Sequence, residues 1–242
     1  MKLRSYKIDM TPLESRYARQ ILLPDFGEEG QQRIRNTKVL IVGVGGLGCP
    51  IASYLVGSGI GTIGLMDDDV VSITNLHRQV LFTEMEVGNP KSSAAKKRLS
   101  ELNRETAIIN YNFRLTAENA RGIISQYDIV VDGCDNFSTR YVIDEVCREQ
   151  NKPYVYGSIQ GLSGQVSVFC TGENPKYYRD LFPEQETSHC EYSKAVLPTT
   201  PAVVGSVEAN QVLLLAANIG EPLIGKLWTI ELDSMESFII DL

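Results

Sequence analysis

The sequence predicts an α/β fold: a Rossmann-like, mostly parallel open sheet with helices on both faces, an N-terminal helical arm and a C-terminal antiparallel β extension. The β-branched run KVLIV (38–42) leads directly into the glycine turn GVGGLG (43–48), which is typical of a strand buried on both faces. A helical pattern and a second apolar run follow, and together they complete a βαβ unit. Further apolar runs then alternate with helical patterns, which indicates a parallel sheet.

The first part of the chain is predicted to be an arm followed by the α/β core. Residues 14–36 mix charged residues with spaced apolar positions and are predicted as helical, with a break near Pro24 and Gly27. The core covers residues 37–170. Its predicted strands lie at 38–42, 62–69, 107–113, 128–136, 153–159 and 165–170, and its predicted helices at 49–59, 91–103, 117–126 and 139–150.

The last part of the chain is predicted to cross the sheet and then close it. Residues 171–200 are rich in charge and proline and show no sustained period, so we interpret them as a crossing loop of functional length. Residues 203–217 indicate a buried helix, and the runs at 227–232 and 237–242 indicate a closing pair of strands within the segment 201–242. We interpret residues 1–242 as one domain.

Composition excludes several classes of protein. Of the 242 residues, 30 are Asp or Glu and 23 are Lys or Arg, giving a net charge of −7, so neither a nucleic acid nor an anionic membrane is an expected partner. No run of 18 apolar residues and no signal peptide are present, and we expect a cytoplasmic protein. The five cysteines include no CxxC pair, which argues against a disulfide framework and a four-cysteine zinc site.

The glycine turn is the first sign of a ligand site. Its glycines let the chain turn tightly and bring backbone N–H groups to a phosphate at the start of a helix; they are Gly43, Gly45, Gly46 and Gly48. Asp67 follows Gly48 by 19 residues, at the end of the next predicted strand, where a carboxylate can accept hydrogen bonds from ribose hydroxyls. These features predict nucleotide binding, and an NAD-dependent oxidoreductase is one class of enzyme in which they occur.

The polar residues that follow favour a triphosphate over a dinucleotide. Arg78 and Lys91 supply cations, and a triphosphate carries more negative charge than a pyrophosphate bridge. Asp132 and Asp135 lie at the end of another predicted strand and so reach the same edge of the sheet, where a carboxylate can hold Mg²⁺ against phosphate oxygens. Asp135 has an alternative interpretation as the cap of the following helix.

Five motifs together resemble one known family. RYARQ (16–20), GVGGLG (43–48), DDDVVSITNLHRQ (67–79), GNPK (88–91) and VVDGCDN (130–136) have the order and spacing found in the HesA/MoeB/ThiF family, the bacterial relatives of ubiquitin-activating enzymes. The resemblance covers roughly residues 14–240. It implies an ATP-dependent enzyme, working as a homodimer, that adenylates the C-terminal glycine carboxylate of a ubiquitin-like sulfur-carrier protein and releases pyrophosphate.

The resemblance also implies individual roles. Asp67 would bind the ribose, Arg78 and Lys91 the phosphates, and Asp135 the magnesium ion. Asp69, Asn75 and Gln79 would line the same pocket, while Arg19 would reach into the partner subunit's ATP site. Cys190 matches a family cysteine that can link to the carrier during sulfur transfer, although Ala195-Val196 replaces the family's Gly-Val. Two CxxC pairs hold zinc in many members, but Tyr177 and Asp180 stand at one of them, and we expect no zinc here.

Several functional alternatives remain open at this point. Because Cys190 is present, we favour a ThiS-like carrier of the thiamine thiazole pathway, with a sulfurtransferase as a possible further partner. A MoaD-like carrier for molybdopterin synthase is the alternative. A non-catalytic family member acting as a binding partner would have no reason to retain the phosphate-binding set. An NAD-dependent enzyme would lack a substrate domain, and an enzyme acting on tRNA fits poorly with the net charge of −7.

Overall fold

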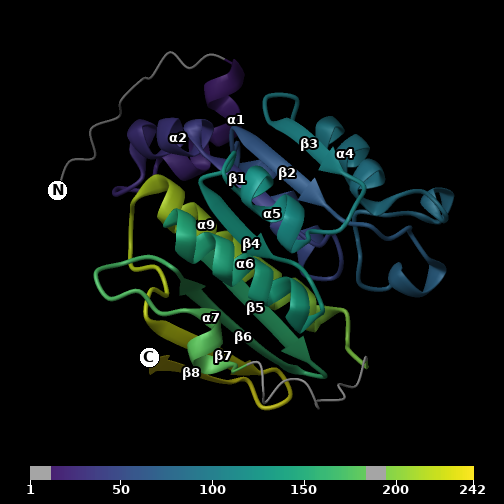
Figure 1. Ribbon diagram of the computed structural model, residues 1–242. Helices are drawn as coiled ribbons and strands as arrows, with labels where there is room; N and C mark the ends of the chain where they lie inside the picture. The colour runs from purple at the N-terminus through teal and green to yellow at the C-terminus, as the bar shows by residue number, and fades with distance from the viewer. Residues whose placement is uncertain (1–11, 184–194) are drawn as a thin grey trace.

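The computed structural model describes residues 12–183 and 195–242 and contains one eight-stranded sheet (Figure 1). The strand order is β3-β2-β1-β4-β5-β6-β7-β8; the first five strands run parallel, and β6, β7 and β8 are antiparallel to their neighbours. The strands are β1 (Lys38–Val42), β2 (Thr62–Met66), β3 (Ala107–Tyr111), β4 (Ile129–Asp132), β5 (Tyr154–Gln160), β6 (Ser163–Phe169), β7 (Lys226–Glu231) and β8 (Glu236–Asp241). The predicted α/β class and the antiparallel extension are confirmed.

Helices cover both faces of the sheet (Figure 1). One apolar core lies beneath α2 (Gly27–Asn36), α3 (Gly48–Ser58), α4 (Lys91–Leu102) and α9 (Thr199–Ala217). The second core lies beneath α5 (Ala117–Ile124), α6 (Phe137–Gln150) and the short α7 (Tyr178–Leu181). In β1 and β2 the last four residues are buried, as expected for strands with helices on both sides.

The helical arm has the predicted break. It consists of α1 (Pro12–Ile21) and α2, joined by a turn that contains Pro24, with Gly27 at a φ of 54°. Two short 3-10 helices, Ile73–Asn75 and Glu84–Glu86, shape the chain between β2 and α4. Within the described residues, no helix combines the length and the apolar character needed to cross a lipid bilayer.

The structure corrects two expectations about the segment 171–200. Its described residues include α7, a single helical turn stabilised by a capping contact from Asp180 to the backbone N–H of Tyr177 at 3.0 Å. Moreover, α9 begins at Thr199 rather than at residue 203. Pro201 lies in the first turn of α9, where a proline is tolerated because its missing N–H has no partner within the helix.

Candidate active site

The parallel strands bring the predicted site residues to one edge of the sheet. In the sheet register Val42 lies opposite both Met66 and Asp132, so β1, β2 and β4 end at the same level. The segments that follow these strands carry the glycine turn, the acidic run at 67–69 and the VVDGCDN motif. This is the edge at which open α/β sheets bind ligands.

The glycine turn is tight because backbone atoms occupy the space that side chains would need. Gly43 has a φ of 96°, and a Cβ atom there would lie 2.4 Å from the carbonyl oxygen of Gly133. A Cβ at Gly48 would lie 2.0 Å from the carbonyl oxygen of Gly43. The turn therefore requires glycine at both positions, and it places the start of α3 directly after β1.

Asp67 braces this turn. Its two carboxylate oxygens accept hydrogen bonds from the backbone N–H groups of Val44, at 2.7 Å, and Asp69, at 2.8 Å. Each oxygen keeps a second lone pair, which can accept from another donor. Burial raises the pKa of the Asp67 carboxyl, and the positive charge of Lys91 opposes this effect.

Lys91 has a nearly buried ammonium group that lies close to the carboxylates of Asp67 and Asp69. Its side chain is 7% exposed, and Nζ lies 2.7 Å from Oδ2 of Asp69. The backbone N–H of Lys91 also donates to the carbonyl of Asp69 at 2.9 Å, and Val70 and Pro90 form a β-bridge beside it. Asp69 and its neighbours therefore fix the position of a cation that begins α4.

A turn after β2 carries the second cation, Arg78, and the buried side chain of Gln79. The carbonyl of Asn75 accepts from the backbone N–H groups of Arg78 and Gln79, while its side-chain oxygen accepts from Ser72. Arg78 is half-buried, and a Cβ at Gly46 would lie 3.6 Å from its Cδ. Its Nη1 atom lies 2.7 Å from Nε2 of His77, and it donates to the Thr74 carbonyl.

Gln79 gives the clearest sign that a polar ligand belongs here. The residue is 3% exposed, yet its side-chain oxygen has no hydrogen-bond partner among the residues that the structure describes. Its Nε2 atom would lie 3.6 Å from a Cβ at Gly45, so the amide faces the glycine turn. Since buried polar atoms in folded proteins are nearly always paired, this oxygen is suited to a donor from a ligand or its bound water.

Asp132 supports the site from below and is not open to a metal ion. It is fully buried, and its Oδ2 atom accepts from Nε of Arg140 at 2.7 Å and from the hydroxyl of Tyr154 at 3.1 Å. Its Oδ1 atom accepts from the backbone N–H and the thiol of Cys134. Burial and the neighbouring Asp132 raise the pKa of the Cys134 thiol, which stays protonated at neutral pH.

The cap of α6 is Asn136 and not its neighbour Asp135. The side chain of Asn136 accepts from the backbone N–H of Thr139 at 3.0 Å and so caps α6. The alternative interpretation of Asp135 as the cap is therefore wrong. Asp135 is exposed, and its carboxylate makes no hydrogen bond or ion pair within the described ranges 12–183 and 195–242. A carboxylate of this kind fits a magnesium ion held against phosphate oxygens.

Two predicted site residues do not join this group. Arg19 is exposed on α1, whose neighbour Gln20 donates to the carbonyl of Ser58 at the C-terminal end of α3. The glycine turn lies at the other end of this 11-residue helix, about 16 Å away along its axis. Cys190 lies outside the described residues.

Sequence reasoning did not single out three buried charged side chains near the site: Arg140, Asp144 and Glu208. Glu208 is the one charged residue of α9, and that isolation in an apolar helix is a signal the sequence contains. Both of its carboxylate oxygens are buried without a hydrogen-bond partner in the described parts of the chain, and a Cβ at Gly157 would lie 2.2 Å from its Cδ. Burial, reinforced by the charge of Asp132, raises its pKa well above the usual range.

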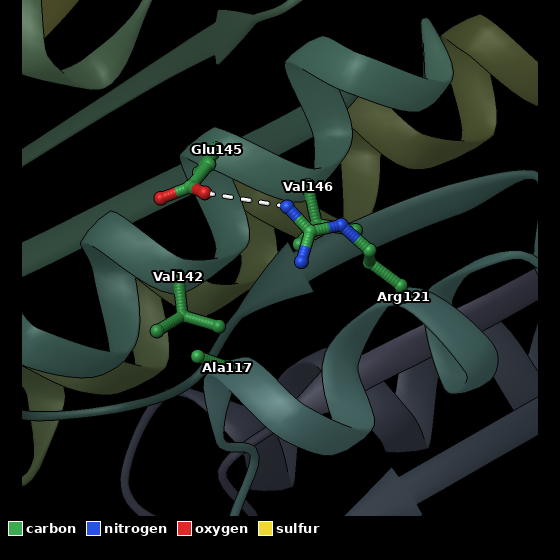
Figure 2. A pocket seen from close by; sticks show the side chains of 5 residues that line it. All are labelled: Ala117, Arg121, Val142, Glu145 and Val146. Atoms are coloured by element: carbon green, nitrogen blue, oxygen red, sulfur yellow. Dashed lines mark hydrogen bonds and ion pairs between the residues drawn. The ribbon is translucent and has the colours of Figure 1, made fainter.

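A hollow elsewhere on the surface is not a candidate for this site. It lies between α5 and α6 and is lined by Ala117, Arg121, Val142, Glu145 and Val146 (Figure 2). Arg121 forms ion pairs there with Glu145 at 3.5 Å and with Glu149 at 2.7 Å. No predicted site residue lines this hollow.

The fold and the site define an α/β protein with a candidate nucleotide-binding site at the carboxyl ends of its parallel strands. Comparisons with known proteins agree with this class. Residues 17–241 match the ThiF family. The chain is 45% identical over 219 residues to a "Sulfur carrier protein adenylyltransferase" of Thermus thermophilus, covering 88% of this chain and 81% of the relative. It is 40% identical to the maize "Adenylyltransferase and sulfurtransferase MOCS3-1", covering 88% of this chain but 46% of that longer protein. The chain belongs to the ThiF family.

A solved structure is similar over most of the chain. The crystal structure of E. coli MccB with ATP has a TM-score of 0.80 and 25% sequence identity, and the match covers 93% of this chain and 71% of MccB. The predicted family and fold class are confirmed, and the relatives' names bear out the predicted adenylyltransferase class.

Proposed function

We propose that this protein uses ATP to adenylate the C-terminal glycine carboxylate of a ubiquitin-like sulfur-carrier protein and releases pyrophosphate. One observation carries the proposal: two cations and an unpartnered buried amide oxygen surround a glycine turn that is braced by Asp67. Lys91, Arg78 and Gln79 supply these groups. The names of the adenylyltransferase relatives support the same reaction.

The chemistry requires alignment and charge neutralisation rather than a general base. The attacking carboxylate is already ionised at neutral pH. The activation barrier has two contributions: the repulsion between two anions and the charge that develops on the leaving pyrophosphate. Fixed cations lower both contributions, because they neutralise this charge without rearranging during the reaction. Lys91, held by Asp69, and Arg78, held by Thr74, meet this requirement.

We assign the magnesium ion to Asp135. When bound, Mg²⁺ neutralises phosphate oxygens and orients the leaving group. Asp135 fits this ion because it is exposed at the same edge, whereas Asp132 is already paired with Arg140 and Tyr154. Asp67 would face the ribose with its remaining lone pairs, and Asn75 would shape the turn that carries Arg78 and Gln79.

We further propose that the active form is a homodimer. Arg19 lies on α1 near the C-terminal end of α3, away from the glycine turn of its own chain, so a role at an ATP site would be at the site of a second copy. The 19-residue helix α9 has no charged residue except buried Glu208, and apolar residues such as Val203, Val207 and Leu214 are half-buried along it. A face of this composition is suited to a second copy of the chain.

The carrier is proposed to be of the thiamine thiazole type, with Cys190 as the residue that can link to it. A molybdopterin-type carrier is the second candidate, and a sulfurtransferase is a possible further partner. The adenylation proposal does not depend on this choice, because both carriers present a C-terminal glycine carboxylate.

The test is ATP–pyrophosphate exchange with purified protein, Mg²⁺ and each carrier in turn. We expect exchange that depends on one carrier. The rate should fall by about a hundredfold or more in Asp135→Asn, because the magnesium ion would lose the carboxylate that holds it and the phosphate charge would no longer be neutralised. Asp68→Asn is the matched control, because Asp68 lies at the same edge but pairs with Arg114 at 3.3 Å. Carrier-independent ATP binding without exchange would refute the proposed reaction and favour a non-catalytic binding role.

A further inference from the structure

Two acceptors hold one nitrogen atom of the Arg78 guanidinium. Its Nη1 atom donates to the carbonyl oxygen of Thr74 at 3.1 Å and lies 2.7 Å from Nε2 of His77. This nitrogen carries two hydrogens, so the two contacts together use both of them. The guanidinium is therefore held at one corner, by a backbone group and by the side chain of its own neighbour in the sequence.

The contact with Arg78 defines the form of the His77 imidazole. Arginine stays protonated in proteins and its side chain can only donate, so Nε2 of His77 is the acceptor. A neutral imidazole with a bare Nε2 carries its hydrogen on Nδ1. His77 itself is exposed on the turn after β2. An exposed histidine thus supplies a neutral acceptor to one of the two cations of the candidate site.

Backbone contacts and packing fix the rest of Arg78. Its N–H donates to the carbonyl of Asn75 at 3.0 Å, which sets its place on the turn. A Cβ at Gly46 would lie 3.6 Å from Cδ of Arg78 and 3.1 Å from Cβ of Pro201, in the first turn of α9. The aliphatic part of Arg78 therefore lies beside the glycine turn, and the two acceptors decide the orientation of the guanidinium plane.

The opposite edge of this guanidinium is open. It consists of Nε and Nη2, for which residues 12–183 and 195–242 supply no hydrogen-bond partner. Two parallel N–H groups on one edge match two oxygens of a phosphate group, and this geometry makes arginine a bidentate ligand for anions. Because Nε is bonded to Cδ, the open edge begins beside the glycine turn. Holding Nη1 therefore fixes the direction of the edge that can bind phosphate.

The acceptors hold Arg78 without offsetting its charge. Lys91, the other cation of the site, lies 2.7 Å from a carboxylate oxygen of Asp69, and this ion pair offsets part of its charge. A backbone carbonyl and a neutral imidazole carry no net charge. Arg78 therefore keeps more of its positive charge for an anionic ligand than Lys91 does.

We propose that His77 is a positioning residue of the nucleotide site: together with the Thr74 carbonyl, its neutral imidazole directs the Nε–Nη2 edge of Arg78 toward the phosphates of a nucleoside triphosphate. The proposal rests on the proposed adenylation function, in which Arg78 binds these phosphates. A guanidinium that is already oriented loses less freedom when the ligand binds. Because His77 is exposed, water competes with it for Arg78, and the effect on affinity is modest.

Nucleotide affinity tests the proposal. In His77→Leu we expect the Kd for ATP with Mg²⁺, measured by calorimetry, to rise about fivefold, because Arg78 loses the shorter of its two contacts. In His77→Gln the Kd should stay within about twofold of the wild type, since the amide oxygen is an acceptor of similar reach. Val80→Ala, in the same segment and 72% exposed, is the matched control. Adenosine, which carries no phosphate, should bind the wild type and all these variants equally.

A double-mutant cycle and a spectroscopic readout separate positioning from a general structural effect. In an Arg78→Lys background, His77→Leu should raise the Kd for ATP no further, because the guanidinium that His77 orients is absent. The nitrogen NMR signals of the His77 imidazole, identified by their loss in His77→Gln, should show the hydrogen on Nδ1. A hydrogen on Nε2 would overturn the proposal, because that nitrogen could then not accept from Arg78.

Three outcomes of the binding experiments would also overturn it: a Kd for ATP in His77→Leu equal to that of Val80→Ala, equal losses of affinity for ATP and adenosine, and a Kd in His77→Gln as high as in His77→Leu. If the wild type binds ATP but shows no carrier-dependent exchange, the adenylation function fails, and the Kd values still decide the role of His77. If exchange occurs and His77→Leu matches the control, the positioning role fails by itself.

Discussion

Glu208 shows how one residue can make the stability of this protein depend on pH. Its carboxyl group is buried between α9 and β5, and within residues 12–183 and 195–242 neither oxygen has a hydrogen-bond partner. A charged carboxylate in that place would be desolvated beside the negative Asp132, so the neutral form is favoured and the pKa is raised. The folded protein therefore holds a proton on Glu208 at pH values where the unfolded chain has released it.

We expect the free energy of unfolding to fall as the pH rises above about 4.5, the ordinary pKa of this group, because the folded state then binds more protons than the unfolded state. Glu208→Gln should remove this contribution. Chemical denaturation from pH 5 to pH 9 should show the variant gaining stability relative to the wild type with rising pH, by about 1.4 kcal/mol for each unit of pKa shift that is removed. Glu173→Gln, at an exposed position, is the control, and parallel curves for Glu208→Gln and the wild type would contradict the prediction.

At the scale of elements, the turn from β1 to α3 is the best-defined feature of the site. It combines a positive φ at Gly43 with contact between the backbones of Gly43, Gly48 and Gly133. Asp67 then fixes Val44, so the start of α3 and the acidic run after β2 are joined. This element needs particular residues because the backbones approach more closely than any side chain permits.

A pair of alanine substitutions tests that account. Gly43→Ala would place a Cβ 2.4 Å from the Gly133 carbonyl, and we expect a loss of stability of about 2 kcal/mol or more, together with weaker ATP binding. At Gly57, inside α3, a Cβ would have open space for 4 Å around it, so Gly57→Ala should stabilise by about 0.5–1 kcal/mol. Urea denaturation measures both. Equal effects of the two substitutions would refute the close-packing argument.

At the scale of the whole molecule, the arm and α9 carry apolar surface that is suited to binding a second copy of the chain. Leu22 and Leu23, directly after α1, are 71% and 54% exposed, which adds apolar surface to the end of the arm that carries Arg19. The eight strands form one continuous sheet. The proposed homodimer would have a functional role if each arm contributed Arg19 to the ATP site of its partner.

Mixing two inactive variants tests this arrangement. Arg19→Ala and Asp135→Ala should each lose carrier-dependent exchange as homodimers. After subunit exchange at equal amounts, about half of the dimers are mixed and each has one complete site, so about one quarter of wild-type activity should return. Exchange activity and sedimentation measure the outcome. No recovery in a mixture shown to contain mixed dimers would place Arg19 outside the partner's site.

The sequence by itself determined the fold class and the composition of the candidate site. Buried β-branched runs, glycines at a strand end and acids after successive strands are local patterns. Such patterns can be recognised in the sequence without knowledge of the tertiary fold. Val42 was placed at a strand end for this reason, whereas the strands predicted at 62–69 and 128–136 end earlier in the structure, at Met66 and Asp132. The motifs also indicated the family, which the match over residues 17–241 confirmed.

Only the tertiary structure decided which charges are paired and which are free. Asp132 and Asp135 belong to the same motif in the sequence, and the structure shows that Arg140 and Tyr154 pair with the first while the second is exposed. The same holds for Asp144, whose partners Tyr178 and Arg179 lie 34 and 35 residues away along the chain. Pairing depends on distances between elements, and burial then fixes the strength of each charge, so neither can be read from local spacing.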